Sequence, residues 1–332
     1  MFANARLRLL RAEPRSICSR MSDPSSNPNP APWLRLSRTK ALGVGGVAIC
    51  ALIWGTTWYA ITLQLGTVTP LVSIVWRFGL AAVVLFLVCL IARQPLKLNR
   101  AQHLAAMGQG LFAFSLSYSF TYAAEGLVTS AIVAVTFASL TLINLILFRL
   151  AAGQKAAGAS WAGAALGVVG VAVLSGSEVL GGGFDGRAGL GVLFALIATT
   201  ASAFGNYFAW KGQSAGSAVI PSTAWAMAYG TAALVIYGVA TGVEWTIEPT
   251  ASYVGSLLYL SLFGSVIAFG LYFTIARVIG YAMASYISAL TPPIAMLVSV
   301  VFEDASFGWS ALAGLALVLG GQVLLIRAPK AG

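Results

Sequence analysis

Apolar stretches long enough to cross a bilayer as a helix, about 18–25 residues each, recur along the chain from residue 42 onward. Proline or glycine marks most of the joints between them, as at Pro70, Gly126, Gly153 and Pro221. The pattern predicts ten transmembrane helices, at residues 42–64, 70–92, 104–124, 127–148, 157–175, 188–210, 220–241, 252–276, 281–301 and 308–326.

Charge alternates in sign between successive connections of this pattern. Apart from Arg77 and Arg187, every Lys and Arg falls in the N-terminal tail or on the side of the N-terminus. An excess of Lys and Arg marks the cytoplasmic side of a membrane protein. We therefore expect a multi-pass protein of a bacterial-type inner membrane with both termini in the cytoplasm. The opposite side holds the acids Glu125, Glu178, Asp185, Glu244, Glu248, Glu303 and Asp304.

Composition supports lipid as the main solvent. The chain is 59% hydrophobic and 8% charged, whereas a soluble domain has about 25% charged residues. The net charge of +10 is spread over short loops and one tail, so no nucleic-acid partner is expected. Cys18, Cys50 and Cys89 are far apart and predict free thiols. We expect neither a metal nor a cofactor.

Residues 1–40 differ from the rest, because they are rich in Arg and Pro and lack an apolar core of signal-peptide length. They predict a disordered cytoplasmic tail. Two alternatives stay open. In the first, residues 1–20 are an upstream artefact and Met21 is the true start. In the second, the basic segment lies against anionic lipid headgroups.

The two halves of the pattern, 42–175 and 188–326, show weak self-similarity. ALIWGTTWYA (51–60) is echoed by ALIATTASAFGNYFAW (195–210), and LFAFSLSYSFTYAAEG (111–126) by LFGSVIAFGLYFTIARVIG (262–280). Five helices is an odd number, so the second copy would insert upside down. The expected fold is an all-α integral membrane protein with ten transmembrane helices as two inverted five-helix repeats, an arrangement typical of secondary transporters.

At this point the chain resembles a known family, the EamA-type transporters of the drug/metabolite transporter superfamily. The resemblance covers residues 42–326 and is carried by ALIWGTTWYA, by VWRF (75–78), and by ALTPPIAMLVSVVFED (289–304), which looks like the family's proline-containing helix ending in a glutamate. The first repeat departs from the family pattern, with Gln154 where that glutamate usually stands. The resemblance implies ten helices, a central cavity, and transport, usually export, of small metabolites such as amino acids.

Polar side chains within the apolar stretches predict where that cavity lies. Trp54 lies about 18 Å along its helix, near the membrane midplane, where its indole N–H needs a partner. Thr57 and Trp58 follow on the same face. Hydroxyl groups often bond to their own backbone instead, and Trp58 and Tyr122 alternatively anchor the membrane interface. The candidate substrate-binding residues are Trp54, Thr57, Trp58, Arg77, Ser115, Tyr118, Tyr122, Thr141, Asn144, Asn206, Tyr272 and Tyr286.

Arg77 is the only charge well inside the predicted helices. It would meet a substrate carboxylate, meet an internal polar partner, or extend outward to pair with an acid such as Glu125. Pro292 and Pro293 are predicted to break the ninth helix, as a hinge, a ligand-facing kink or a packing kink.

The absence of certain residue types from the predicted helices limits the functions to be considered. No acid lies deep in a predicted helix, and the sole histidine, His103, lies at a helix end. A proton relay through a deep acid is therefore not expected, and facilitated exit or exchange is favoured. No nucleophile lies beside a base, so we do not expect an enzyme. The favoured function is export of small metabolites by alternating access, with the lipid bilayer and a small-molecule substrate as partners. The alternatives are a drug or nucleoside exporter and a membrane scaffold.

Overall fold

The computed structural model describes residues 32–181 and 186–327. The chain divides into two units, Met1–Lys40 and Ala41–Gly332. Residues 1–31 of the predicted tail lie outside the described residues, and residues 32–40 are helical because α1 begins at Pro32. The disordered tail predicted for residues 1–40 therefore does not extend to its last nine positions.

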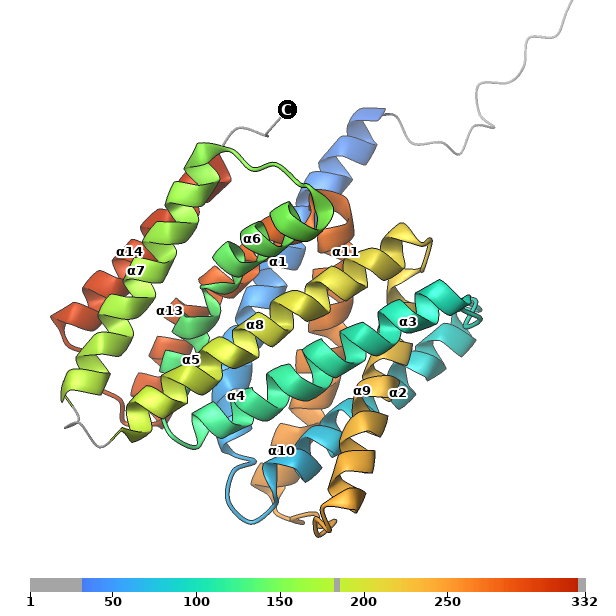
Figure 1. The fold of residues 1–332 in the computed structure, drawn as a ribbon, viewed down its shortest axis with the longest axis horizontal. Helices are drawn as coiled ribbons and strands as arrows, with labels where there is room; N and C mark the ends of the chain where they lie inside the picture. Colours follow the sequence, from blue (N-terminus) through green and yellow to red (C-terminus); the bar gives the residue numbers. More distant parts are fainter. Residues whose placement is uncertain (1–31, 182–185, 328–332) are drawn as a thin grey trace, which may run out of the picture. The chain divides into compact units, whose positions relative to one another are not determined.

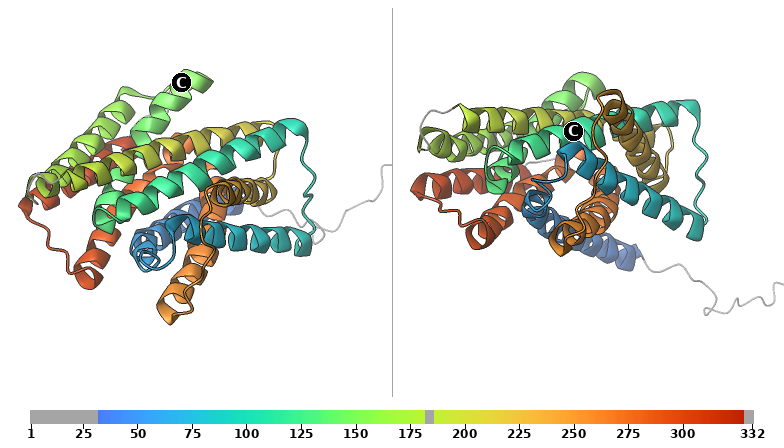
Figure 2. Two further views of the ribbon diagram at one scale, coloured as in Figure 1. Left: turned by 60° about the horizontal axis from the view of Figure 1, so that its bottom comes forward. Right: turned by 90° about the horizontal axis from the view of Figure 1, so that it is seen from below.

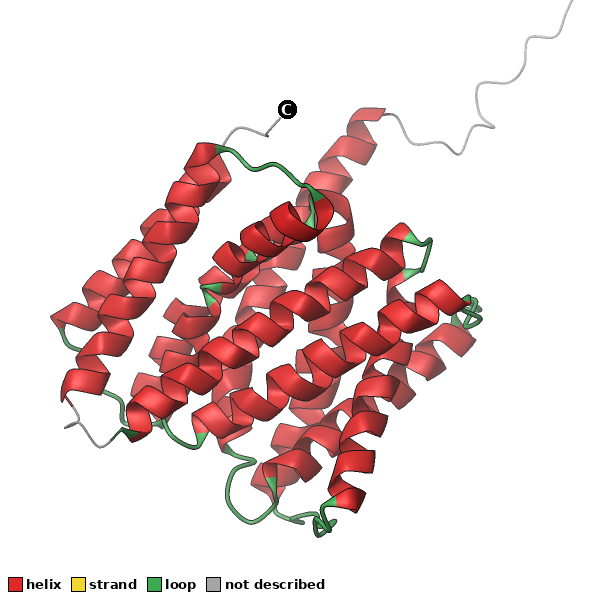
Figure 3. Ribbon diagram, in the orientation of Figure 1, coloured by secondary structure: helices red, strands yellow, loops and turns green. Residues whose placement is uncertain are grey.

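Helices joined by short connections make up the described chain (Figures 1 and 3). No strand occurs among the residues that the structure describes. The elements are α1 (Pro32–Thr62), α2 (Pro70–Ile91), α3 (Arg100–Gln109), η2 (Gly110–Leu116), α4 (Ser117–Glu125), α5 (Ser130–Phe137), α6 (Leu140–Ala152), α7 (Gly158–Gly181), α8 (Arg187–Ser214), α9 (Val219–Ala240), α10 (Ala251–Tyr259), η3 (Leu260–Ile267), α11 (Ala268–Ile279), α12 (Tyr281–Ala284), α13 (Tyr286–Phe302) and α14 (Trp309–Arg327).

Six helical segments of the described chain are long and apolar enough to cross a membrane: Gly45–Thr62, Pro70–Ile91, Ser130–Ala152, Arg187–Ser214, Val219–Ala240 and Ala251–Ile279. Shorter apolar helices cover Gly158–Leu174, Tyr286–Phe302 and Trp309–Leu324. The prediction of an all-helical membrane protein is thus confirmed, while the count of ten and the inverted repeat stay predictions. Residues 100–125 form a helix of sufficient length, but polar side chains such as Gln109, Ser115 and Ser117 lower its hydropathy.

Connections gather at two opposite ends of the helices (Figure 1). We call one the basic end; it holds connections 92–99, 153–157 and 215–218, with Arg93, Lys97 and Lys155. We call the other the acidic end; it holds connections 63–69, 126–129, 241–250 and 303–308, with Glu244, Glu248, Glu303 and Asp304. The assignment of the basic end to the cytoplasm remains a prediction.

Glycines let α7 and α14 pack at short range along one side of the bundle (Figures 1 and 2). A methyl group on Gly170 would lie 2.6 Å from the carbonyl oxygen of Gly314, which no side chain could tolerate without movement. Between membrane helices, small residues of this kind replace the hydrophobic effect with close van der Waals packing.

Two π-helical segments interrupt helices that the apolar pattern predicts as continuous. η2 joins α3 to α4 within residues 104–124, and η3 joins α10 to α11 within residues 252–276. A π turn carries one extra residue, so it rotates the following helical face and changes which backbone carbonyls are free, and it is frequent at functional sites. The two segments occupy the similar stretches LFAFSLSYSFTYAAEG and LFGSVIAFGLYFTIARVIG.

The predicted break at Pro292 and Pro293 was wrong, because α13 continues through both residues. Proline removes a backbone donor, and the hydroxyl of Thr291 donates to the carbonyl oxygen of Ser288 at 2.9 Å, which satisfies an acceptor freed by the missing N–H. The interruption lies instead at Ser285, between α12 and α13. A hinge at the two prolines remains a prediction.

Candidate functional site

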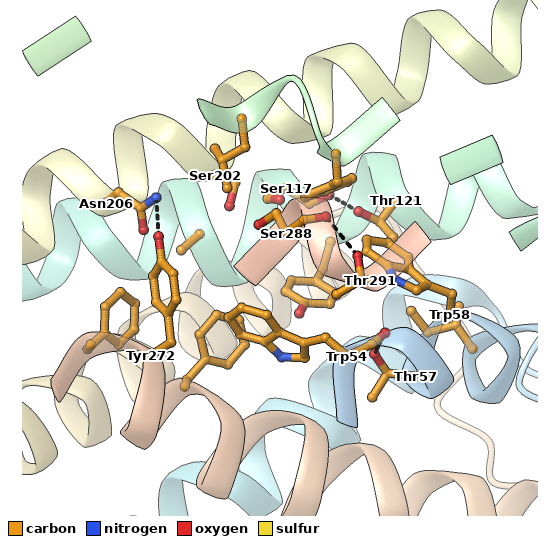
Figure 4. Close-up of a pocket in the computed structure, with 17 residues that line it drawn as sticks. Trp54, Thr57, Trp58, Ser117, Thr121, Ser202, Asn206, Tyr272, Ser288 and Thr291 are labelled. Carbon is orange, nitrogen blue, oxygen red and sulfur yellow. Dashed lines mark hydrogen bonds between the residues drawn. The ribbon is translucent and has the colours of Figure 1, made fainter. Parts of the chain in front are cut away.

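A small cavity lies among the helices of the second unit (Figure 4). Its volume of about 50 Å³ has room for a few water molecules, so any larger molecule would require side chains or helices to move apart. Its polar and aromatic lining comes from α1, α4, α5, α8, α11 and α13. The labelled side chains of Figure 4 are Trp54, Thr57, Trp58, Ser117, Thr121, Ser202, Asn206, Tyr272, Ser288 and Thr291.

Trp54 joins the cavity wall to the π-helical segment η3. Its indole N–H donates to the carbonyl oxygen of Gly264 at 3.2 Å. Its ring lies 5.1 Å from that of Phe269 and 5.2 Å from that of Tyr272, between centroids. The expected partner for a buried indole N–H is therefore present, and it is a backbone acceptor on a helix of the second half of the chain.

Aromatic side chains close the cavity toward the basic end. The amide of Asn206 donates to the Tyr272 hydroxyl at 2.9 Å, and both residues are buried. Beyond them, Phe148 stacks on Tyr281 with centroids 5.7 Å apart and packs edge-on against Trp210 at 5.8 Å. A hydrogen bond and this ring cluster therefore separate the cavity from the basic end.

Toward the acidic end, Arg77 is buried beside the cavity at 1% exposure. Its Nε donates to the Ser265 hydroxyl at 3.1 Å, and its Nη2 donates to the Tyr118 hydroxyl at 3.5 Å. The guanidinium carbon lies 4.5 Å from the centre of the Tyr118 ring, within cation–π range. Arg77 therefore has internal polar partners and does not extend outward. Among the described residues it forms no ion pair with Glu125.

Tyr122 and Trp58 both face the interior of the protein. Tyr122 is fully buried, and its hydroxyl donates to Gln64 Oε1 at 2.7 Å. Trp58 lines the cavity with its ring 4.9 Å from that of Phe137. Within the described chain the Trp58 indole N–H is buried without a hydrogen-bond acceptor. Both side chains therefore belong to the protein interior, and their position relative to the membrane interface stays a prediction.

The structure brings part of the predicted set into the cavity wall. Trp54, Thr57, Trp58, Tyr118, Asn206 and Tyr272 line it. Arg77 and Tyr122 lie beside it toward the acidic end. Ser115, Thr141, Asn144 and Tyr286 lie elsewhere: Ser115 donates to the carbonyl of Gly230 at 2.8 Å, Thr141 donates to that of Ser285 at 3.4 Å, Asn144 is fully buried, and Tyr286 packs with Leu145 and Ala164.

Several lining residues were missing from the predicted set. Ser117 and Thr121 are four residues apart, Ser202 lies four residues before Asn206, and Ser288 and Thr291 are three residues apart. That spacing was a usable signal, because residues three or four apart lie on one helix face. The apolar members Phe137, Leu140, Phe269 and Phe273 carried no comparable signal.

Nothing in the described residues forms a metal centre: no group of three His, Cys, Asp or Glu side chains lies close enough to hold an ion. Cys50 and Cys89 are buried free thiols, and Cys18 lies outside the described residues. The chemistry the cavity offers is hydrogen bonding and aromatic contact from neutral side chains.

Comparison with known proteins shows which family the chain belongs to. The family model described as "EamA-like transporter family" matches residues 41–176 and 189–327. Trp54, Thr57 and Tyr118 come from the first matched segment, and Asn206 and Tyr272 from the second.

Individual relatives agree. The chain is 25% identical over 279 residues to the "Uncharacterized transporter YoaV" of Bacillus subtilis (strain 168), covering 80% of this chain and 86% of that protein. It is 29% identical over 91 residues to "Protein PagO" of Salmonella typhimurium (strain LT2), covering 27% of this chain and 30% of that protein. A solved structure titled "Crystal structure of protein" matches with a TM-score of 0.66 and 19% identity, over 89% of this chain and 99% of that chain, which shows a shared fold.

Proposed function

Because the chain belongs to the EamA-like transporter family, whose members are membrane transporters, we propose that it exports small metabolites, amino acids first, across a bacterial inner membrane. The observation that carries the proposal is the cavity itself. Both family-matched segments contribute aromatic and polar side chains to one buried space. Sites built between two halves of a carrier allow each half to move around a bound solute.

The lining favours a neutral or zwitterionic solute with an apolar part. Trp54, Trp58 and Phe269 offer aromatic faces, and Thr57 and Asn206 offer neutral polar groups. No charged side chain lines the cavity among the described residues. A cationic drug would therefore lack a counter-charge in the wall, whereas a carboxylate at the acidic side of the cavity would lie next to the Tyr118 hydroxyl that Arg77 contacts.

Alternating access follows from what closes the cavity at each end. Toward the basic end the barrier is the Asn206–Tyr272 hydrogen bond and the rings around Phe148. Toward the acidic end it is the Tyr122–Gln64 hydrogen bond and the side chains around Arg77. Opening one barrier while the other stays packed would expose the cavity to one side at a time, and the interruption at Ser285 and the prolines of α13 are the hinge candidates.

Counterflow in proteoliposomes tests transport directly. Unlabelled amino acids are loaded inside, and uptake of the labelled counterpart is followed from outside. We expect counterflow for at least one amino acid with an apolar side chain, and its loss to background in Trp54→Ala. Trp309→Ala is the matched control, because Trp309 is 87% exposed and lies away from the cavity. Normal counterflow in Trp54→Ala would remove this cavity from the transport path.

A membrane scaffold would have no water-accessible path to the cavity. In a variant without native cysteines, Asn206→Cys should react with a small water-soluble thiol reagent, and a transported solute should slow the reaction. A thiol that stays unreactive under all conditions, together with no flux for amino acids, nucleosides or drugs, would support the scaffold.

A further inference from the structure

Glu125 is the last residue of α4 at the acidic end, and it is 6% exposed. Neither of its carboxylate oxygens accepts a hydrogen bond from any residue that the structure describes. Glu303, at the same end, is different: its Oε2 accepts hydrogen bonds from Ser130 at 2.6 Å and from Ser299. One of the two acids is therefore supplied with donors, while the other is buried without them.

The position of Glu125 connects it to the cavity. Tyr118, Thr121 and Glu125 are spaced three and four residues apart along α4, so they lie on one helix face. The first two line the cavity. Glu125 therefore lies one helical turn beyond the lining, between the cavity and the acidic end.

The charged groups around Glu125 come from three other elements. Arg77 of α2 and Glu303, which follows α13, are close enough to act on it electrostatically. Arg187 begins α8, which packs against α4. On its own element the titratable neighbours are the phenols Tyr118 and Tyr122. Arg77 forms no ion pair with it in the described chain, and Nη1 of Arg77 is buried there without a hydrogen-bond partner.

An ionised carboxylate is costly to bury unless a charge or hydrogen-bond donors compensate it. Glu125 lacks donors, and Glu303 beside it adds like charge, so the neutral acid suits this arrangement. Arg77, whose Nη1 is free, provides a counter-charge that a shift of α2 against α4 would bring into contact. The ionised form would therefore suit a second arrangement, with the acidic end opened to water or with Arg77 paired to Glu125.

We propose that Glu125 is a proton-binding site that couples solute movement to the pH gradient. It holds a proton while the acidic end is packed as in this structure and releases it when that end opens. Binding forms one O–H bond from a solvent proton and a carboxylate lone pair, and release reverses it, so no co-reactant is needed. This inference rests on the proposed transport function, and it departs from the expectation of facilitated exit or exchange.

The test compares net flux with and without a pH gradient in proteoliposomes. For the wild type we expect the gradient to change the initial rate several-fold. Glu125→Gln, which mimics the protonated acid, should keep counterflow at equal pH and lose the response to the gradient. Glu244→Gln is the matched control, because it removes the same charge from an exposed position at the same end. Wild-type flux that ignores the gradient, or a Glu125→Gln variant that responds like the wild type, would overturn the proposal.

A second measurement does not depend on flux or on the variant's folding. Infrared spectra of the wild-type protein, taken in a detergent without ester groups, should show the C=O band of a protonated carboxylic acid at neutral pH, where exposed glutamates are ionised. Absence of that band would overturn proton binding at Glu125. If no solute is carried by the wild type, the transport function fails, and absence of the infrared band would still separately overturn proton binding at Glu125.

Discussion

The two π-helical segments, η2 in the first half and η3 in the second, share a backbone irregularity but serve different neighbours. In η2, Gly110 faces backbone: a methyl group there would lie 2.8 Å from the amide nitrogen of Gly230 in α9. In η3, Gly264 faces side chains: a methyl group there would lie 2.8 Å from Thr57 Cγ2 and 3.3 Å from Arg77 Nη2. One segment thus packs against a helix backbone, and the other contacts the polar side chains beside the cavity.

Their serines show the same division. Ser115 of η2 donates to the Gly230 carbonyl at 2.8 Å, which ties two helices together. Ser265 of η3 accepts from Arg77 Nε at 3.1 Å, and the Gly264 carbonyl accepts from the Trp54 indole. A π turn thus rotates the helix face that follows it. The role of that rotated face depends on which residues pack against it. We infer that η2 supports the fold and η3 supports the site.

The strongest test of this difference is Gly110→Ala. The added methyl group meets backbone atoms of α9 that cannot rotate away, so we expect a loss of about 3 kcal/mol or more in stability, at or above the upper end of typical overpacking costs. The measurement is the midpoint temperature of thermal unfolding, with size-exclusion chromatography used to follow how much purified protein remains folded after heating.

Gly255→Ala is the matched control for that prediction. Gly255 lies in α10, and nothing lies within 4 Å of a methyl group placed on it. Replacing an unconstrained helix glycine by alanine should stabilise by about 0.5–1 kcal/mol. Equal midpoints for the two variants would mean that η2 does not hold α9 at short range.

A serine pair sharpens the comparison at smaller magnitude. Ser265→Ala leaves Arg77 Nε without its acceptor, and a hydrogen bond to a charged group contributes about 1.5–3 kcal/mol. We expect the transport rate to fall by about ten-fold or more. Ser115→Ala should cost about 1 kcal/mol of stability and leave flux per folded molecule unchanged.

Counterflow normalised to folded protein separates the two serine variants. If Ser115→Ala lowers normalised flux as much as Ser265→Ala does, the division of labour between η2 and η3 is wrong. If neither changes it, the network around Arg77 serves the fold alone.

Much of the helical layout could be predicted from the sequence, because a bilayer demands apolar runs of a set length and short polar connections interrupt them. The site was harder. Trp54 and Asn206 were found because large polar groups inside apolar runs need partners. Arg77, Tyr122 and Glu125 were ambiguous, because their direction depends on helix rotation and not on composition.

The π turns explain that ambiguity for Glu125. In a regular α-helix through residues 104–124, the direction of the side chains in the last turn would be fixed relative to that of Gln109. The extra residue carried by η2 rotates the face of α4 by about 100°. The π turn begins where Gly110 packs against α9, and nothing local in LFAFSLSYSFTYAAEG marks that contact. The sequence therefore suggested an outer connection for an acid that is buried.

The smallest expected effect comes from Trp54→Phe, which tests the hydrogen bond between the Trp54 indole and the Gly264 carbonyl of η3. The variant keeps an aromatic ring against Phe269 and Tyr272 and removes the indole N–H that Gly264 accepts. A lost hydrogen bond of this kind contributes about 1 kcal/mol, which corresponds to a change of about five-fold in an equilibrium constant. We expect the concentration for half-maximal counterflow to rise by that factor at an unchanged maximal rate. A fall in the maximal rate alone would mean that Trp54 sets the movement of η3 and does not hold the solute.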